Sequence, residues 1–303
     1  MDGHPELRID ETPTLRRPVL IAAFKGWNDG GQAATLAAST LVRAWSAERF
    51  ADIDPEGFVD FQSTRPTVSL VQGMTRRIDW PENVFHAGAI SGAERDAVIL
   101  LGVEPNYRWR AFTDLVTGLA RELGVELVVT LGALLADVPH TRPAPVTGAA
   151  TDPSLVEELG LQLSRYEGPT GIVGVLHDAC RAAELRSVSL WSAVPHYVSL
   201  APSPRAAKAL CSRLSDLLGV PIDMTELDEA EAEYATQVSE AVASDPDTQA
   251  YVEELEHRAD TIESFAEGGE LPSGESLAAE LTRFLRERDH ERRDLPPDEP
   301  GQG

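Results

Sequence analysis

The 303-residue sequence predicts an α/β domain followed by an acidic helical extension. Up to residue 222, short β-rich apolar runs alternate with longer segments of helical period, which is the pattern of a sheet covered by helices on its faces. Hydrophobic residues make up 42% of the chain, enough to bury a substantial core. Beyond residue 222 the composition changes to helix-forming residues with many carboxylates. We therefore expect an α/β core domain over residues 1–222.

Six short runs rich in β-forming residues predict the strands. Two of them, residues 97–103 and 126–131, lack polar alternation, as expected of central strands buried on both faces. Between residues 137 and 153, four prolines and little apolar periodicity predict a long loop. The predicted strands are residues 19–24, 58–62, 97–103, 126–131, 171–176 and 189–194.

Start and stop signals define the helices of this domain. Ser203 is expected to cap a helix over residues 204–218, Pro204 suits its first position, and Gly219 suits the left-handed turn after it. Asp29 is expected to cap a helix that runs to about residue 45. A further helix is expected over about residues 107–123.

The acidic extension is predicted to be helical over residues 225–243, 246–266 and 274–290. Residues 223–303 hold 24 acids and six arginines. Apolar residues recur at helical spacing within the extension and need a covering surface on the core domain or on a partner subunit. We expect an extension over residues 223–290 and a disordered tail over residues 291–303, which contain three prolines and no periodicity.

Charge and composition exclude several functional classes. The formal net charge of −24 repels a phosphate backbone, so we expect no nucleic-acid binding. No apolar run approaches the roughly 20 residues that span a membrane, and the first residues do not resemble a signal peptide. Two cysteines are too few for a disulfide framework or a four-thiolate zinc site. We expect a cytoplasmic protein without a metal, a cofactor or a membrane contact.

Polar and aromatic residues follow five of the six predicted strands, so the carboxyl edge of the sheet is the leading candidate site. Because these loops converge at one edge, we expect their side chains to lie together. Catalytic residues are not assigned, since no complete catalytic motif is present. The candidate ligand-binding residues are Lys25, Trp27, Asn28, Asp29, Glu104, Arg110 and His140.

Several of these residues have a structural interpretation beside the functional one. Glu104 is either a general acid or base or, as we favour, the partner of Arg108 or Arg110 in a structural ion pair. The glycine-rich run at residues 26–31 is more simply a tight turn than a phosphate cradle.

His177 and Cys180 lie three residues apart, a spacing at which they could act as a base and a nucleophile. We favour instead a cysteine packed inside a helix that begins near Asp178. Cys211, on the predicted helix over residues 204–218, is expected to belong to the core.

Four segments taken together resemble the proteasome assembly chaperone 2 family in its actinobacterial branch. They are GWNDGGQAA, EPNYRWRAF, LGALLADVPHTRP and YVSLAPSPRAAKALCSRL, and the resemblance spans about residues 15–260. It implies a three-layer α/β/α core similar to the nucleoside phosphorylase fold, a helical C-terminal region, and homo-oligomers that are often trimers. Eukaryotic namesakes hold proteasome α-subunits during ring assembly, so the resemblance implies protein binding.

Two functions remain open from the sequence. The first is a non-enzymatic assembly or interaction protein that forms a homo-oligomer, most simply a trimer, and binds a protein partner. The alternative is an enzyme or sensor that binds a small anionic or nucleoside-like metabolite at the carboxyl edge of the sheet.

Overall fold

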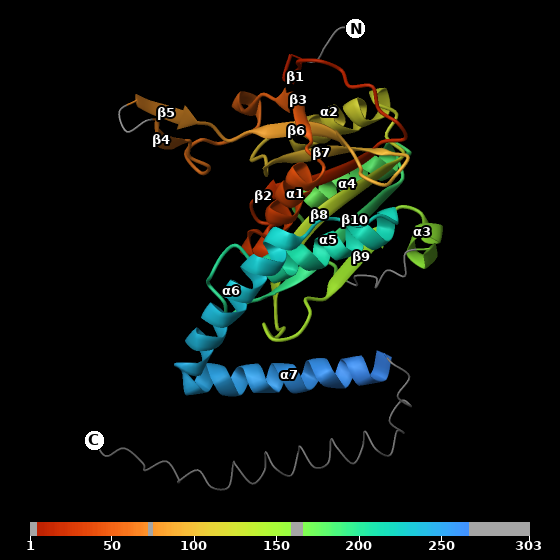
Figure 1. Cartoon of the computed structure of the whole chain (residues 1–303). Helices are drawn as coiled ribbons and strands as arrows, with labels where there is room; N and C mark the ends of the chain where they lie inside the picture. The colour runs from red at the N-terminus through yellow and green to blue at the C-terminus, as the bar shows by residue number, and fades with distance from the viewer. Residues whose placement is uncertain (1–4, 72–74, 159–165, 267–303) are drawn as a thin grey trace, which may run out of the picture. The chain divides into compact units, whose positions relative to one another are not determined.

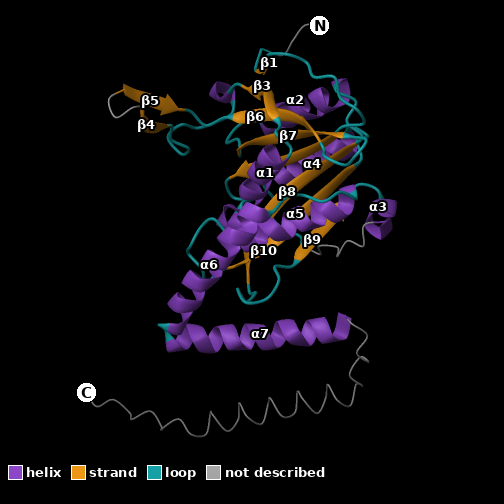
Figure 2. Ribbon diagram, viewed as in Figure 1, coloured by secondary structure: helices purple, strands orange, loops and turns teal. Residues whose placement is uncertain are grey.

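An eight-stranded mixed sheet forms the centre of the fold (Figures 1 and 2). The computed structural model describes residues 5–71, 75–158 and 166–266. Residues 1–256 form one compact unit, and residues 257–303 form a second, of which the structure describes the end of one helix. In spatial order the strands are β1 (Leu7–Ile9), β3 (Glu48–Ile53), β6 (Asn83–Ala89), β7 (Asp96–Val103), β2 (Val19–Lys25), β8 (Leu127–Ala136), β10 (Ser187–Pro195) and β9 (Val146–Ala150).

Helices cover both faces of this sheet. Along β2, Val19 and Ile21 belong to one apolar cluster with α1 (Ala33–Ala44) and α5 (Pro204–Leu218). The alternate residues, Leu20 and Phe24, belong to a second cluster with α2 (Trp109–Glu122) and α4 (Ile172–Ala182). Because successive side chains of a strand point to opposite faces, both faces of β2 are buried. The predicted three-layer α/β/α arrangement is confirmed.

The four central strands are parallel and bring their carboxyl ends to one edge. β2 pairs in parallel with β7 and with β8, and β8 pairs in parallel with β10. The ladder between β2 and β8 ends at Leu131, so the last residues of β8 extend past it. The turns after β2, β7, β8 and β10 therefore form the edge that the sequence predicts as the candidate site.

The prediction of a strand over residues 58–62 is wrong. This segment follows a short 3-10 turn, Pro55–Gly57, and Phe58 and Val59 are buried in a loop. The carbonyl of Phe58 accepts hydrogen bonds from the backbone amides of Asn106 and Tyr107, at 2.8 and 3.0 Å. The amide of Phe58 donates to the carbonyl of Pro55 at 3.0 Å, so neither backbone group of Phe58 takes part in a strand ladder. The apolar composition therefore reflects burial of a loop.

The prediction of a strand over residues 171–176 is also wrong, since α4 begins at Ile172. A short apolar run is ambiguous between a buried strand and a buried helix. The buried positions Ile172, Val173, Leu176 and Cys180 follow helical spacing across the whole element. The cysteine is therefore in a helix, as expected, but that helix begins before Asp178.

Several strands were not anticipated from the sequence. The loop expected over residues 137–153 contains β9, which pairs antiparallel with β10, and α3 (Pro153–Glu158) follows it. β1, β3 and β6 extend the sheet beyond β7. Two more strands, β4 (Thr67–Val71) and β5 (Thr75–Asp79), form a separate two-stranded sheet.

The predicted helices at residues 225–243 and 246–266 are confirmed as α6 (Thr225–Ala243) and α7 (Pro246–Ala266). Tyr234, Val238 and Val242 of α6 pack with Val252 of α7 and with the segment after β10. The chain itself thus covers the apolar stripe of α6.

No described helix is long and apolar enough to cross a membrane. The helix expected at 274–290 and the tail at 291–303 lie outside the described residues, and the division at residue 222 stays a prediction.

Candidate functional site

Glu104, which directly follows β7, joins three segments at the carboxyl edge of the sheet. Its Oε2 accepts a hydrogen bond from the backbone amide of Trp27 at 3.0 Å. Its Oε1 accepts two more, from the Nδ2 of Asn28 at 2.7 Å and from the backbone amide of Ile172 at 2.9 Å. Ile172 begins α4, so the carboxylate satisfies an amide that the first helical turn leaves without a partner.

The favoured prediction of an ion pair between Glu104 and Arg108 or Arg110 is wrong. Arg108 instead bonds to Glu6 at 2.7 Å, and its guanidinium group lies 5.0 Å from the ring centroid of Phe58. Arg110 is exposed on the first turn of α2 and pairs with no carboxylate among the described residues. The carboxylate points instead to the turn after β2, which parallel strand pairing brings beside it.

Two glycines make room for this carboxylate. A Cβ atom at Gly171 would lie 2.4 Å from the side-chain amide of Asn28 and 2.6 Å from Oε1 of Glu104. At Gly26, where φ is +152°, a Cβ would lie 2.8 Å from both the Cβ and the Oε2 of Glu104. The glycine-rich turn therefore allows a close approach of backbone to a carboxylate, in agreement with the structural interpretation of this run.

A cleft of about 380 Å³ opens beside Glu104. Its walls come from the turn after β2, the turn after β7, the start of α2 and the segment before α4. Trp27 is 63% exposed in this region, and the Lys25 side chain is exposed. The volume lies in the range of small-molecule sites. The main lining residues are Lys25, Trp27, Glu104, Asn106, Trp109 and Thr170.

Asp29 holds the start of α1. Its Oδ1 accepts hydrogen bonds from the backbone amides of Ala34 and Thr35, and its Oδ2 accepts one from the Thr35 hydroxyl at 2.5 Å. Burial of Asp29 raises the pKa of its carboxyl group, and these hydrogen bonds oppose that rise. The predicted capping function is confirmed, although the residue directly before the helix is Gln32.

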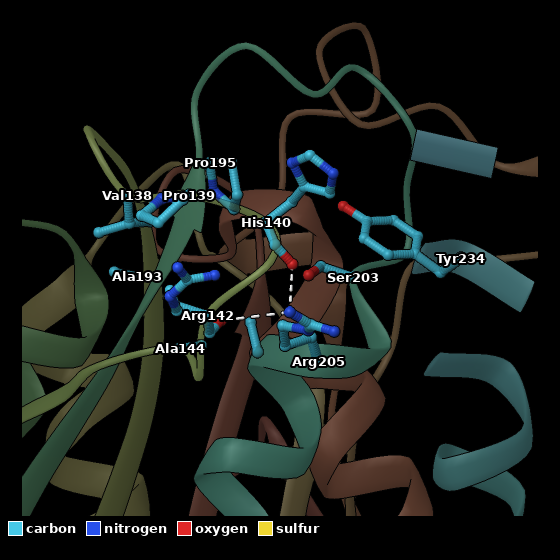
Figure 3. Close-up of a pocket in the computed structure, with 11 residues that line it drawn as sticks. Val138, Pro139, His140, Arg142, Ala144, Ala193, Pro195, Ser203, Arg205 and Tyr234 are labelled. Atoms are coloured by element: carbon cyan, nitrogen blue, oxygen red, sulfur yellow. Dashed lines mark hydrogen bonds between the residues drawn. The ribbon is translucent and has the colours of Figure 1, made fainter. Parts of the chain in front are cut away.

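His140 belongs to a different part of the edge, near α5 and α6 (Figure 3). Its Nδ1 lies 2.8 Å from the Tyr197 hydroxyl, and its Nε2 lies 3.2 Å from the Ser239 hydroxyl of α6. Arg205 of α5 donates to the carbonyl oxygens of His140 and Arg142 (Figure 3). The cavity at this position has a volume of about 10 Å³, which suits one water molecule and no organic ligand.

The burial of His140 predicts a pH-dependent stability. Burial first, and then Arg205, lower the pKa of His140, while Glu256 opposes the shift. The unfolded chain therefore takes up a proton near the ordinary histidine pKa of about 6.5, where the folded chain does not. We expect the free energy of unfolding, measured with urea, to fall between about pH 7 and pH 5.5.

The variant His140→Gln serves as the control for this prediction. It should lose less stability over the same pH interval than the parent. Burial also lowers the pKa of His86 and His177, so part of the pH dependence remains. An equal loss of stability in the parent and in the variant would contradict the assignment to His140.

Both cysteines are buried and structural, as expected from the sequence. Burial raises the pKa of Cys180 and of Cys211 to about 12, so neither thiol is ionised near neutral pH. The Nδ1 of His177 lies 2.9 Å from the hydroxyl of Ser187, at the start of β10. Within the described residues, no group of three or more His, Cys, Asp or Glu side chains is arranged to hold a metal ion.

The seven predicted ligand-binding residues therefore divide between several places. Lys25, Trp27 and Glu104 line the cleft, and the buried side chain of Asn28 donates a hydrogen bond to Glu104. Asp29 faces α1, Arg110 is exposed on α2, and His140 bonds to α6. Trp109 and Thr170 also line the cleft but are not among the seven predicted residues. Trp109 belongs to the EPNYRWRAF segment and was recognisable there, whereas Thr170 follows no predicted strand and had no signal.

Solved structures of similar proteins cover most of this chain. A PAC2 family protein from Streptomyces avermitilis is 47% identical, with 78% of this chain and 99% of that chain covered and a TM-score of 0.72. A proteasome-assembly chaperone homologue from Mycobacterium tuberculosis is 44% identical, with coverages of 77% and 99% and a TM-score of 0.71.

A more distant structure shares the fold alone. The archaeal proteasome activator of Pyrococcus furiosus is 22% identical, with coverages of 78% and 97% and a TM-score of 0.63. The comparison with curated proteins gives no match. The sequence profile of the PAC2 family matches residues 23–242, which is most of the chain. Together with the two relatives above 40% identity, this match shows that the chain belongs to the PAC2 family.

Proposed function

We propose that this protein is a non-enzymatic assembly factor that acts as a homo-oligomer, most simply a trimer, and binds a protein partner. The observation that carries the proposal is the bonding of Glu104. Both of its oxygens accept hydrogen bonds from groups that hold the fold together, namely two backbone amides and the buried side chain of Asn28. A general acid or base must instead reach a substrate proton.

The other nucleophile candidates support the same proposal. The thiols of Cys180 and Cys211 are buried, and burial raises their pKa to about 12. The PAC2 relative from M. tuberculosis is described as a proteasome-assembly chaperone homologue. A proteasome α-subunit is therefore the first partner to test.

The experiment is to assemble proteasome α- and β-subunits from the same organism with and without this protein. We expect it to form a complex of defined mass with the α-subunit and to accelerate the appearance of assembled rings on native gels. If the protein forms no complex with the α-subunit and does not change the rate of ring assembly, the proteasome is not its partner. If cross-linking in its own cells also gives no protein partner, the protein-binding proposal fails.

A second candidate function, binding of a small anionic metabolite, is favoured by the cleft at Lys25. The exposed ammonium group of Lys25 and the indoles of Trp27 and Trp109 suit a planar anion. A ligand at 100 times its dissociation constant stabilises the folded state by roughly 2.7 kcal/mol. We expect such a ligand to raise the thermal midpoint of the parent and not that of Lys25→Ala. Equal shifts in both proteins, or none in the parent across a panel of nucleosides, phosphate, nucleotides and carboxylates, would contradict it.

A further inference from the structure

The β4–β5 hairpin is separate from the main sheet and extends away from it on the side of β6 (Figures 1 and 2). Its two strands pair with each other in a regular antiparallel register and, among the residues that the structure describes, with no third strand. A two-stranded hairpin is marginally stable in water, and it usually needs a third strand or a packing surface. The hairpin is therefore a candidate for a contact that the single chain does not supply.

One face of the hairpin is apolar and exposed. The register pairs Val68 with Ile78 and Leu70 with Arg76, so these four side chains share a face. Val68, Leu70 and Ile78 are 58%, 64% and 53% exposed. We call these four residues the hairpin face. Neighbouring exposed apolar side chains of this kind mark an interaction surface, whereas single ones do not.

The hairpin with its flanking residues is also basic, in contrast to the rest of the protein. Residues 65–80 contain three arginines and one aspartate, a net charge of +2, in a chain with a formal charge of −24. Arg77 bonds to Asp79 at 2.6 Å. Within the described part of the chain, Arg65 and Arg76 form no ion pair, and both are exposed. The surface that covers the hairpin face should therefore be acidic.

Helix α6 offers such a surface. Its acids near the core are compensated, because Glu226 bonds to Arg43 at 2.9 Å and Glu231 bonds to Arg205 at 2.9 Å. Three outer acids, Glu229, Glu233 and Glu240, are exposed and pair with no cation among the described residues.

Positions four and seven apart on a helix lie on one face, so these three carboxylates form a single row. Ala232 and Thr236 lie beside the row, and both are exposed. We call these five residues the acidic face of α6. It combines carboxylates for the arginines of the hairpin with small side chains for its apolar residues.

We propose that the hairpin face of one copy packs on the acidic face of α6 of a second copy. This inference rests on the homo-oligomer of the proposed function and names its interface. The hairpin and α6 lie far apart on the compact unit of residues 1–256 (Figure 1). The contact is therefore head-to-tail, since each copy presents its hairpin face to one neighbour and its acidic face of α6 to the other. A head-to-tail contact that closes makes a ring, which a trimer would satisfy.

Leu70→Asp tests the apolar part of the contact. The parent should sediment as an oligomer, and the variant should dissociate with a dissociation constant raised about tenfold or more, since a leucine becomes a buried charge beside carboxylates. Leu135→Asp, at a leucine of β8 that is 58% exposed, is the matched control and should leave the mass unchanged. Both variants should keep the far-ultraviolet circular dichroism spectrum of the parent, which separates dissociation from misfolding, because loss of the interface alone lowers the urea midpoint.

A charge exchange tests whether the acidic face of α6 is the surface that covers the hairpin face. Arg76→Glu should weaken the oligomer, and adding Glu229→Arg and Glu233→Arg in the same chain should restore it. A parent that is monomeric at all concentrations, an oligomer unaffected by Leu70→Asp, equal dissociation in the Leu135→Asp control, or no restoration in the triple variant would each overturn the proposal. Binding of the α-subunit is measured separately, so the interface can fail while the protein-binding function stands.

Discussion

Replacing Glu104 by alanine should lower the free energy of unfolding by about 3 kcal/mol, as measured by urea denaturation. The variant removes the acceptor for the backbone amides of Trp27 and Ile172 and for the side chain of Asn28. Asn28 is fully buried in the parent, and its Nδ2 loses the Glu104 oxygen to which it donates at 2.7 Å. Hydrogen bonds to a charged group contribute more than neutral ones, and donors that remain unpaired add the cost of their desolvation.

The control is Glu104→Gln, which keeps one carbonyl oxygen at the same distance along the side chain. It should cost roughly half as much as the alanine variant, because one oxygen can still accept while the new amide group meets donors. A Glu104→Ala protein as stable as the parent would show that these three hydrogen bonds do not hold the carboxyl edge together. It would also return Glu104 to the list of groups available for catalysis.

Replacing Phe112 by alanine should have a still larger effect, about 4 kcal/mol lost from the free energy of unfolding. Phe112 of α2 is fully buried, with its ring 5.8 Å from Phe24 and 5.5 Å from Phe58, both in edge-to-face geometry. The substitution leaves a cavity among these rings and removes both aromatic pairs. Phe24 directly precedes Lys25 of the cleft, and the ring of Phe58 lies 5.0 Å from the guanidinium group of Arg108.

Phe112→Leu is the matched control, because leucine fills most of the cavity and removes the aromatic pairs alone. We expect it to cost about 1–2 kcal/mol in the same urea measurement. If alanine and leucine at this position cost the same, the cavity is not the main cause. Near-parent stability of Phe112→Ala would mean that the surrounding helices collapse to fill the space.

Local features of the sequence determined several elements of the fold. The helix over residues 204–218 has its predicted bounds because Pro204 lacks an amide hydrogen and Gly219 adopts a left-handed conformation with φ of +67°. The strands β2, β7, β8 and β10 were predicted because each is an apolar run between turn residues. Such a run is buried whichever neighbouring strand it pairs with. These features belong to neighbouring residues and require no knowledge of distant contacts.

Only the tertiary structure decided where the candidate site residues lie and what they bond to. Residues 171–176 were predicted as a strand, yet they begin a helix whose first amide bonds to Glu104, 68 residues earlier in the chain. Glu104 was expected to pair with an arginine on its own turn, whereas parallel pairing of β2 and β7 brings it beside Trp27 and Asn28.

His140 and Asp29 likewise follow strands that end at one edge, but they bond to different helices. The sequence by itself determined which segments are apolar, helical or acidic, because those properties depend on residues a few positions apart. The pairing order of the strands determined the partners of each polar group, because a hydrogen bond forms between whichever groups the packed sheet brings within about 3 Å.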